Sequence, residues 1–250
     1  MNRIESLAEN VLNAATGEYF SVDLLDMNGL GLAHFLLMEG GTLGDLYSLA
    51  DYKYDSNGMI VVNEDGTISP QTITDAKNYV KLGSVLPKAN MSWRNDFRIG
   101  NFNLGFLITA RLGGIVYSST QAVLDYYGVS EASAAARDAG GVFINGGDCI
   151  DANKWFSSVG GSNPLPQEYT YSGTNVRLQE ASIGYTIPRK KLGDVCDLHL
   201  SLVGRNLWMI YNKAPFDPEA VATTGNYYQG IDHFMMPSLR NFGFNVRVTF

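Results

Sequence analysis

The end of the chain alternates apolar and polar residues without a break. From Phe242 to Phe250 every second side chain is apolar, and Gly, Asn, Arg and Thr stand between them. Successive side chains of a β-strand point to opposite faces, so this pattern predicts a strand with one apolar and one polar face. A tilted strand of about ten residues covers about 25 Å, the height of the apolar band of an outer-membrane barrel.

Similar alternation upstream predicts four more long strands. In the third of them the apolar phase changes near Glu180, which indicates a β-bulge. The connections between the strands alternate in length, being short at Gly100-Asn101 and at 188–196 and long at 114–174 and 211–237. Short periplasmic turns and long external loops are typical of outer-membrane barrels. The predicted strands cover 90–100, 101–113, 175–187, 197–210 and 238–250.

These patterns predict an all-β fold, an antiparallel transmembrane β-barrel segment made of the last five or six strands of a larger barrel. The long loop 114–174 contains an alanine-rich run after Ser130, which predicts a short helix over 130–139. Residues 90–250 thus form the strand region with its loops. Residues 1–89 are predicted to be an upstream region of strand and external loop, with a β-hairpin near 59–68.

The first residues of the chain are less regular. Residues 19–25 are compatible with a further strand, and 4–15 with a short helix. The start has neither the basic region nor the apolar core of a secretory signal, and no run of eighteen apolar residues occurs. An outer-membrane protein needs such a signal, so we expect the chain to be a piece of a longer protein.

Composition and charge exclude several functions. With a net charge of −7 the chain cannot neutralise a run of phosphates, so no nucleic-acid partner is expected. Cys149 and Cys196 form no C-x-x-C pair and the three histidines are far apart, so we predict no metal site and no cofactor. The calcium-loop pattern at 53–64 has Lys53 at the first ligand position, which favours a plain turn. No nucleophile motif is present, and we predict no enzyme activity.

Several motifs resemble, in order, the SusC/RagA family of TonB-dependent outer-membrane transporters. The segment Asn175-Val-Arg-Leu-Gln-Glu-Ala-Ser-Ile-Gly-Tyr-Thr-Ile-Pro188 is similar to a strand of that family, N-x-R-L-(R/K)-x-(L/V)-S-L-G-Y-T-(F/L)-P. The similarity covers about residues 40–250 and concerns the carboxy-terminal barrel portion of the family. Further matches are Lys81-Leu-Gly-Ser-Val-Leu-Pro87, Asn101-Phe-Asn-Leu104, Ala110-Arg-Leu-Gly-Gly-Ile-Val-Tyr117, Gly204-Arg-Asn-Leu-Trp208, Phe216-Asp-Pro-Glu219 and Phe242–Phe250.

The resemblance implies a barrel of about twenty-two strands with an amino-terminal plug, located in the bacterial outer membrane and surrounded by its lipid. It implies nutrient uptake, of an oligosaccharide or a peptide, with a SusD-like lipoprotein partner and energy from the TonB complex acting through a missing amino-terminal part. It also implies that Phe250 is the recognition signal for outer-membrane assembly. Signal, plug and most strands are missing, so the chain is expected to be a transporter fragment.

Aromatic residues give the remaining candidate sites. Trp208, at the end of a long strand, fits the aromatic girdle of a membrane interface. Rings in the long loops can stack on sugars or peptides, and they give candidate ligand or partner residues. These are Tyr126, Tyr127, Trp155, Tyr227 and Tyr228.

The alternative is a soluble, secreted β-sandwich that binds glycans or mediates adhesion. The two cysteines distinguish the alternatives, because in a barrel Cys149 lies in an external loop and Cys196 in a periplasmic turn. A disulfide between them is incompatible with the barrel, whereas a sandwich could bring them within about 7 Å.

Overall fold

The structure is a computed structural model, and it describes residues 3–223, 225 and 228–250. The chain divides into two compact units. Unit 1 comprises residues 1–86, 114–171 and 221–235, so it takes in most of the two long loops as well as the start of the chain. Unit 2 comprises residues 87–113, 172–220 and 236–250.

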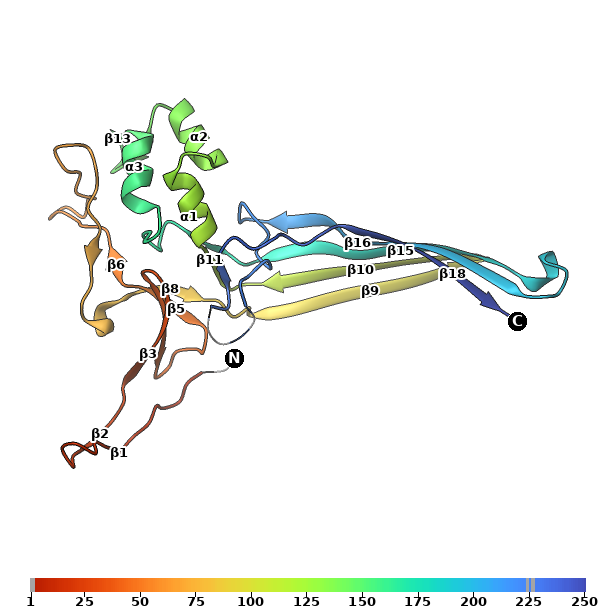
Figure 1. Ribbon diagram of the computed structural model, residues 1–250, viewed down its shortest axis with the longest axis horizontal. Helices are drawn as coiled ribbons and strands as arrows, with labels where there is room; N and C mark the ends of the chain where they lie inside the picture. Colours follow the sequence, from red (N-terminus) through yellow and green to blue (C-terminus); the bar gives the residue numbers. More distant parts are fainter. Residues whose placement is uncertain (1–2, 224, 226–227) are drawn as a thin grey trace. The chain divides into compact units, whose positions relative to one another are not determined.

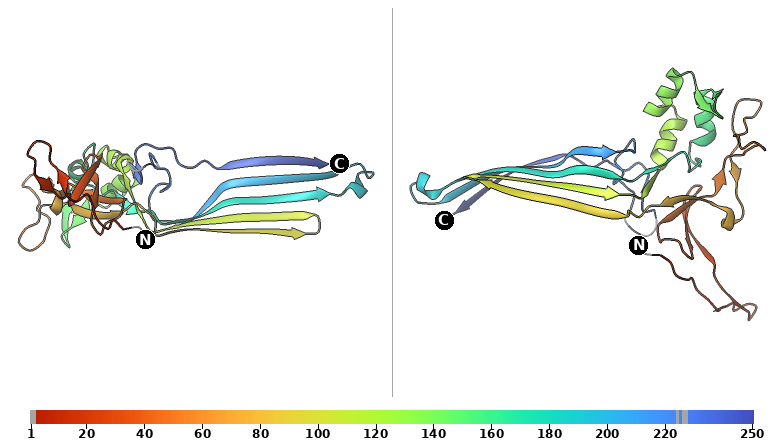
Figure 2. Two further views of the ribbon diagram at one scale, coloured as in Figure 1. Left: turned by 90° about the horizontal axis from the view of Figure 1, so that it is seen from below. Right: turned by 180° about the vertical axis from the view of Figure 1, so that it is seen from behind.

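Unit 2 is built on one antiparallel sheet of five long strands. Figures 1 and 2 show the strands side by side, from β9 in yellow to β18 in dark blue. Their order in the sheet is β18-β16-β15-β10-β9, so β18 and β9 are the two edges. The prediction of a mostly β, antiparallel fold is confirmed. The strands are β9 (Ala89–Ile99), β10 (Phe102–Leu112), β15 (Asn175–Ile187), β16 (Asp197–Asn212) and β18 (Asn241–Thr249).

Short connections hold neighbouring strands of this sheet in register. Gly100 has a φ of 60°, which an L side chain rarely adopts, and it allows the tight turn between β9 and β10. A 3₁₀ helix, η2 (Arg189–Lys191), lies in the short link between β15 and β16. There the Asp197 carboxylate accepts a hydrogen bond of 2.6 Å from the backbone N–H of Arg189, which closes the turn.

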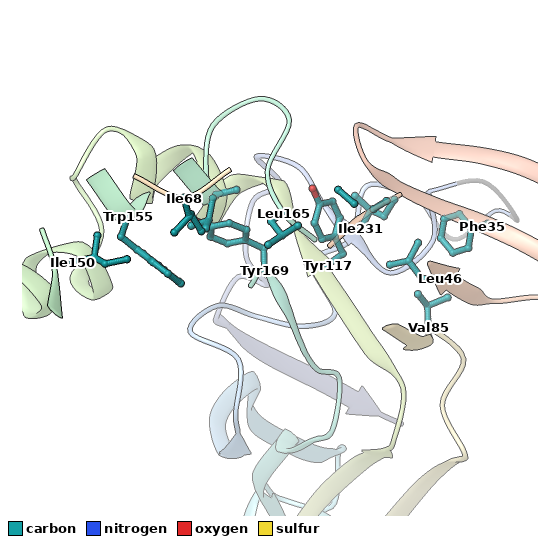
Figure 3. Packing of buried hydrophobic residues seen from close by; sticks show 14 residues of the cluster. Phe35, Leu46, Ile68, Val85, Tyr117, Ile150, Trp155, Leu165, Tyr169 and Ile231 are labelled. Carbon is teal, nitrogen blue, oxygen red and sulfur yellow. The ribbon is translucent and has the colours of Figure 1, made fainter. Parts of the chain in front are cut away.

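Unit 1 contains the buried hydrophobic core. Its side chains come from the sheet β3-β4-β5-β8, from the helices and from β11 and β17. Figure 3 shows Tyr117 and Ile231 packed in the middle of this cluster. The four-stranded sheet comprises β3 (Leu24–Leu30), β4 (Ala33–Met38), β5 (Asp45–Ser48) and β8 (Val80–Ser84), and the three-stranded sheet comprises β14 (Thr170–Ser172), β11 (Ile115–Ser118) and β17 (Ile231–Asp232).

Three α-helices occur in the described part of the chain, all in the long loop after β11. They are α1 (Ser119–Tyr126), α2 (Glu131–Asp138) and α3 (Ala152–Val159). The helix expected near 130–139 is α2, where the Ser130 hydroxyl accepts a hydrogen bond of 2.9 Å from the N–H of Ser133. No helix within 3–223, 225 and 228–250 has the length and hydropathy to cross a membrane.

Small two-stranded sheets and turns complete unit 1. Residues 4–15 form no helix, because Val11 and Leu12 pair with Phe20 and Tyr19 instead. Near 59–68 the structure has isolated bridges, Tyr54 with Ile60 and Val62 with Ile68. The small elements are β1 (Val11–Leu12), β2 (Tyr19–Phe20), β6 (Ala50–Asp51), β7 (Gln71–Thr72), η1 (Ala76–Asn78), β12 (Val142–Ile144) and β13 (Asp148–Ile150).

Candidate functional site

The five-stranded sheet of unit 2 has one apolar and one polar face. The register places Leu202 of β16 opposite Phe244 of β18 and Ile183 of β15, whereas the next residue, Val203, is opposite Gly243 and Ser182. Large side chains of the apolar face remain exposed to a degree unusual for a water-soluble surface. They include Trp93, Phe97, Ile99, Phe102, Leu104, Ile183, Leu202, Trp208, Phe242, Phe244, Val246 and Val248.

The polar face carries a network of ion pairs across strands. Glu180 of β15 lies 3.0 Å from Arg205 of β16 and 3.9 Å from Arg94 of β9. Arg94 in turn pairs with Asp96 at 2.9 Å. The arginines are more than half exposed, so each pair contributes little to stability by itself, and the network makes this face a wetted, charged surface.

Small residues next to this network leave a hollow of about 410 Å³ on the polar face. A Cβ on Gly105 would come within 2.7 Å of the Asp96 carboxylate, and one on Gly184 within 2.8 Å of the His199 ring. His199 shares a hydrogen bond of 2.9 Å with the Thr186 hydroxyl, as expected for an imidazole on a polar face. The glycines therefore leave room for the polar side chains of neighbouring strands.

A β-bulge in β15 keeps the charged residues on the polar face. Glu180 pairs with Leu107 and Leu178 with Ile108, so Gln179 is an extra residue. The change of phase predicted near Glu180 is therefore a bulge. Without it Glu180 would turn to the apolar face, because the side chains of a strand alternate with a strict period of two.

A second bulge lies next to the first in β16 and explains the motif Gly204-Arg-Asn-Leu-Trp208. Arg205 pairs with Glu180 and Trp208 with Leu178, so Asn206 and Leu207 face one residue of β15. Asn206 has a φ of 52° and its amide donates to the Leu239 carbonyl at 3.0 Å. A Cβ on Gly204 would come within 2.6 Å of the Leu207 side chain, so a larger residue here requires Leu207 to move.

A buried arginine joins two of the sequence motifs. Arg177, whose side chain is 4% exposed, lies 2.8 Å from Asp217 and 3.2 Å from Glu219. Asp217 also accepts hydrogen bonds from the N–H groups of Glu219 at 3.1 Å and Ser238 at 3.2 Å. Burial opposes ionisation of Asp217, but the hydrogen bonds and the Arg177 charge outweigh it, so its pKa lies below the ordinary value. The cluster fixes the segment after β16 against β15.

Two of the candidate ligand residues lie together in unit 1. The rings of Tyr126 and Tyr127 meet edge to face, with centroids 5.2 Å apart, and both are exposed. With Arg137 and Phe156 they line a pocket of about 220 Å³ between the three helices. Asp125 also lines it, and burial raises the pKa of this carboxyl although Ser130 and Gln121 donate hydrogen bonds to it.

The other predicted residues are placed differently. Trp155 belongs to the core with 5% exposure and stacks on Tyr52, with centroids 6.1 Å apart, so its ring is not accessible at the surface. Tyr228 is exposed and has a φ of 60°, and Tyr227 lies outside the described residues. Trp208 is 62% exposed on the apolar face, and Phe250, 86% exposed, follows β18. Both cysteines are free.

Sequence reasoning missed the Arg177 cluster and the role of Gln179. The signal for the cluster was present, since Arg177 and the pair Asp217 and Glu219 belong to two of the motifs quoted for the family resemblance. Alternation indicated a bulge near Glu180 but not which residue is the extra one.

Comparison with known proteins agrees with these features. No protein-family model matches the chain. Over 220 residues the chain is 24% identical to the TonB-dependent receptor P3 of Formosa agariphila, covering 85% of this chain and 21% of that protein. Two solved structures of the RagAB peptide importer have TM-scores of 0.60 in the closed-closed state and 0.61 in the open-open state. Their sequences are 15% and 13% identical to this chain, with 94% and 93% of it covered.

The long antiparallel sheet with one apolar face is that of a membrane β-barrel wall, and this is the class of structure to which unit 2 belongs. In sequence the chain is similar to a TonB-dependent receptor, and in fold to the RagAB structures, as the resemblance to the SusC/RagA family predicts. It spans about a fifth of the curated relative and about a quarter of the RagAB chains that it matches. It therefore corresponds to a part of the length of these proteins.

Proposed function

We propose that the chain forms part of the wall and external loops of an outer-membrane transporter that takes up an oligosaccharide or a peptide. The observation that carries this proposal is the two-faced sheet of unit 2. Its apolar face is exposed over all five strands, while the opposite face holds the ion-pair network of Glu180, Arg94 and Arg205. Lipid on one side and water on the other satisfy both faces.

In this proposal the whole protein works with a SusD-like lipoprotein and with the TonB complex, and it has no catalytic role. The loops of unit 1 contribute to ligand or partner binding through Tyr126, Tyr127 and Tyr228. Trp155 is not part of this proposal, because its ring is buried in the core. Tyr227, an aromatic residue of the long loop 211–237, is a further candidate of this group. Trp208 lies at the membrane interface, and Phe250 serves as an assembly signal.

The test labels single cysteines placed on the two faces of one strand. In a protein without its two native cysteines, Leu202→Cys and Ser201→Cys are adjacent in β16 but belong to opposite faces. In outer-membrane vesicles opened to reagents, we expect a charged, water-soluble maleimide to modify Ser201→Cys much faster than Leu202→Cys. A lipid-soluble maleimide should show the opposite preference.

Equal labelling of both positions by the charged reagent, or recovery of the protein in the soluble fraction, would refute the proposal and favour the secreted β-sandwich. Transport is tested separately in cells with and without the gene, using radiolabelled peptides and oligosaccharides. Uptake that needs the gene and stops when an uncoupler removes the proton gradient is the expected result. Uptake that persists with the uncoupler would contradict energy transfer through TonB.

A further inference from the structure

The short link between β15 and β16 contains the only run of adjacent basic residues in the sequence. The run is Arg189-Lys190-Lys191, which forms the 3₁₀ helix η2, and its three side chains are exposed. The chain as a whole has a net charge of −7, so its composition does not explain this concentration of positive charge. The surroundings of the run indicate what it binds.

Hydrogen bonds hold the backbone of the link in one conformation. The N–H of Lys191 donates to the carbonyl of Pro188 at 2.8 Å. The carbonyl of Arg189 accepts from the N–H of Leu192 at 2.8 Å and from that of Asp194 at 2.9 Å. These bonds keep the basic side chains next to one another at the end of the sheet.

The three cations differ in whether they are paired. The Arg189 guanidinium lies 3.3 Å from the carboxylate of Asp197. The side chains of Lys190 and Lys191 form no ion pair or hydrogen bond within the described residues. Asp194, the other acid of the link, is not paired with either lysine within the same residues. Two ammonium groups therefore remain available to an anion from outside the protein.

The link adjoins the apolar face of the sheet. Tyr185 of β15 is paired with Phe102 of β10, their ring centroids lie 4.8 Å apart, and β15 ends two residues later at Ile187. Figure 1 shows this turn at the same end of the sheet as the carboxy-terminus. Aromatic rings are typical of the level at which lipid tails meet headgroups. The lysines that follow Ile187 therefore lie at the level of the headgroups.

We propose that Lys190 and Lys191 bind the headgroup phosphate of an anionic phospholipid. The inference rests on the membrane location in the proposed function, which places the link 188–196 on the periplasmic side, and it adds a lipid site to that function. Long lysine stems can lie along apolar surface while their ammonium groups reach a phosphate. A zwitterionic lipid also carries a phosphate, but the cation of its own headgroup competes with the lysines. Each basic residue near an anionic membrane surface strengthens binding about fivefold.

The test compares two lipids around the link in vesicles that contain the complete protein. Cys149 and Cys196 are replaced by serine, and a fluorophore is attached to Val195→Cys, a position 64% exposed in the same link. The vesicles contain equal parts of phosphatidylglycerol and phosphatidylcholine, and one of the two carries bromine on its acyl chains, which quenches the fluorophore on contact. We expect phosphatidylglycerol to bind about five- to thirtyfold more strongly at low salt, and the preference to decrease at high salt.

Two double variants separate the lysines of the link from charge in general. Lys190→Gln with Lys191→Gln removes both ammonium groups and should bring the preference close to one. Lys53→Gln with Lys77→Gln removes the same charge from two exposed lysines of unit 1 and should leave the preference unchanged. Inorganic phosphate, compared with chloride at the same ionic strength, should not displace the lipid, because the membrane surface presents headgroups at a much higher local concentration.

Four results would overturn the inference. These are equal quenching by both brominated lipids, an unchanged preference after substitution of the two lysines of the link, an equal loss in the control variant, and displacement of the lipid by phosphate but not by chloride. A chain that does not lie in the membrane would be quenched by neither lipid. That outcome refutes the proposed function itself, so the two failures are distinguishable.

Discussion

Replacing Arg177 by methionine tests whether the buried ion-pair cluster holds the loop after β16 in place. Arg177 lies 2.8 Å from Asp217 and 3.2 Å from Glu219. At an effective dielectric constant of about 20 these distances correspond to attractions of about 6 and about 5 kcal/mol. The cost of removing the ions from water, several kcal/mol for each, offsets most of this gain.

Removing one partner of the ion pair should cost more free energy of unfolding than the intact pair contributes. Arg177→Met keeps an unbranched apolar stem but leaves the Asp217 carboxylate buried without its cation. The expected loss in the free energy of unfolding is about 3–5 kcal/mol, as for other buried pairs that lose one partner. The double substitution Arg177→Met with Asp217→Leu should recover part of this loss, because the buried carboxylate is then absent.

The assay is urea unfolding of the complete protein in detergent micelles, followed by tryptophan fluorescence. Hydrogen exchange of residues 213–220 provides a local readout. The matched control is Arg98→Met, an exposed arginine of the same face, for which a change within about 0.5 kcal/mol is expected. If Arg177→Met cost no more than Arg98→Met and left hydrogen exchange at 213–220 unchanged, the cluster would not fix this loop.

The remaining predictions concern the second bulge and unit 1. Gly204→Val should destabilise the protein by about 1–3 kcal/mol in the same unfolding assay, because a Cβ would come within 2.6 Å of Leu207. The control, Gly100→Asn, lies at a turn with open space and should be tolerated. In unit 1, Asp45 is buried, but hydrogen bonds from Lys81 and Thr42 outweigh the effect of burial, so its pKa lies below its ordinary value. Its contribution to stability is therefore present above about pH 4 and is lost as the pH falls through the folded-state pKa. Asp45→Asn should speed hydrogen exchange in β5 and β8 at pH 7 and have a smaller effect near pH 2.5, and an equal effect at both pH values would contradict this.

The elements that could be predicted from the sequence are those determined by residues close together in the chain. The strands of unit 2 could be predicted because the alternation of apolar and polar residues at Phe242–Phe250 or in β10 indicates which face each side chain occupies. Helix α2 was readable because Ser130 caps a run of alanines. Helices α1 and α3 were not readable, since α1 contains Val123 and α3 depends on the burial of Trp155 and Val159 in the core. Such helices are stabilised by packing against segments far away in the sequence.

In the candidate site, too, local features could be predicted from the sequence and long-range contacts could not. The phase change near Glu180 indicated a bulge, because it interrupts a period that only neighbouring residues define. The pairing of Arg177 with Asp217, forty residues later, required the fold itself. Trp155 was a reasonable choice for a ligand residue by its type and its loop. Its burial against Tyr52 is decided by contacts that composition and periodicity do not report.

The order of strands in unit 2 has a practical consequence for handling this polypeptide. β9 and β18 form the two edges of the sheet, and each presents the backbone N–H and C=O groups of one side to any strand that can pair with them. Produced alone at high concentration, the chain would pair these edges with other copies and precipitate as strand-rich aggregates. Supplied with a second polypeptide that carries matching strands, the same two edges become the seams along which a split barrel could be reassembled.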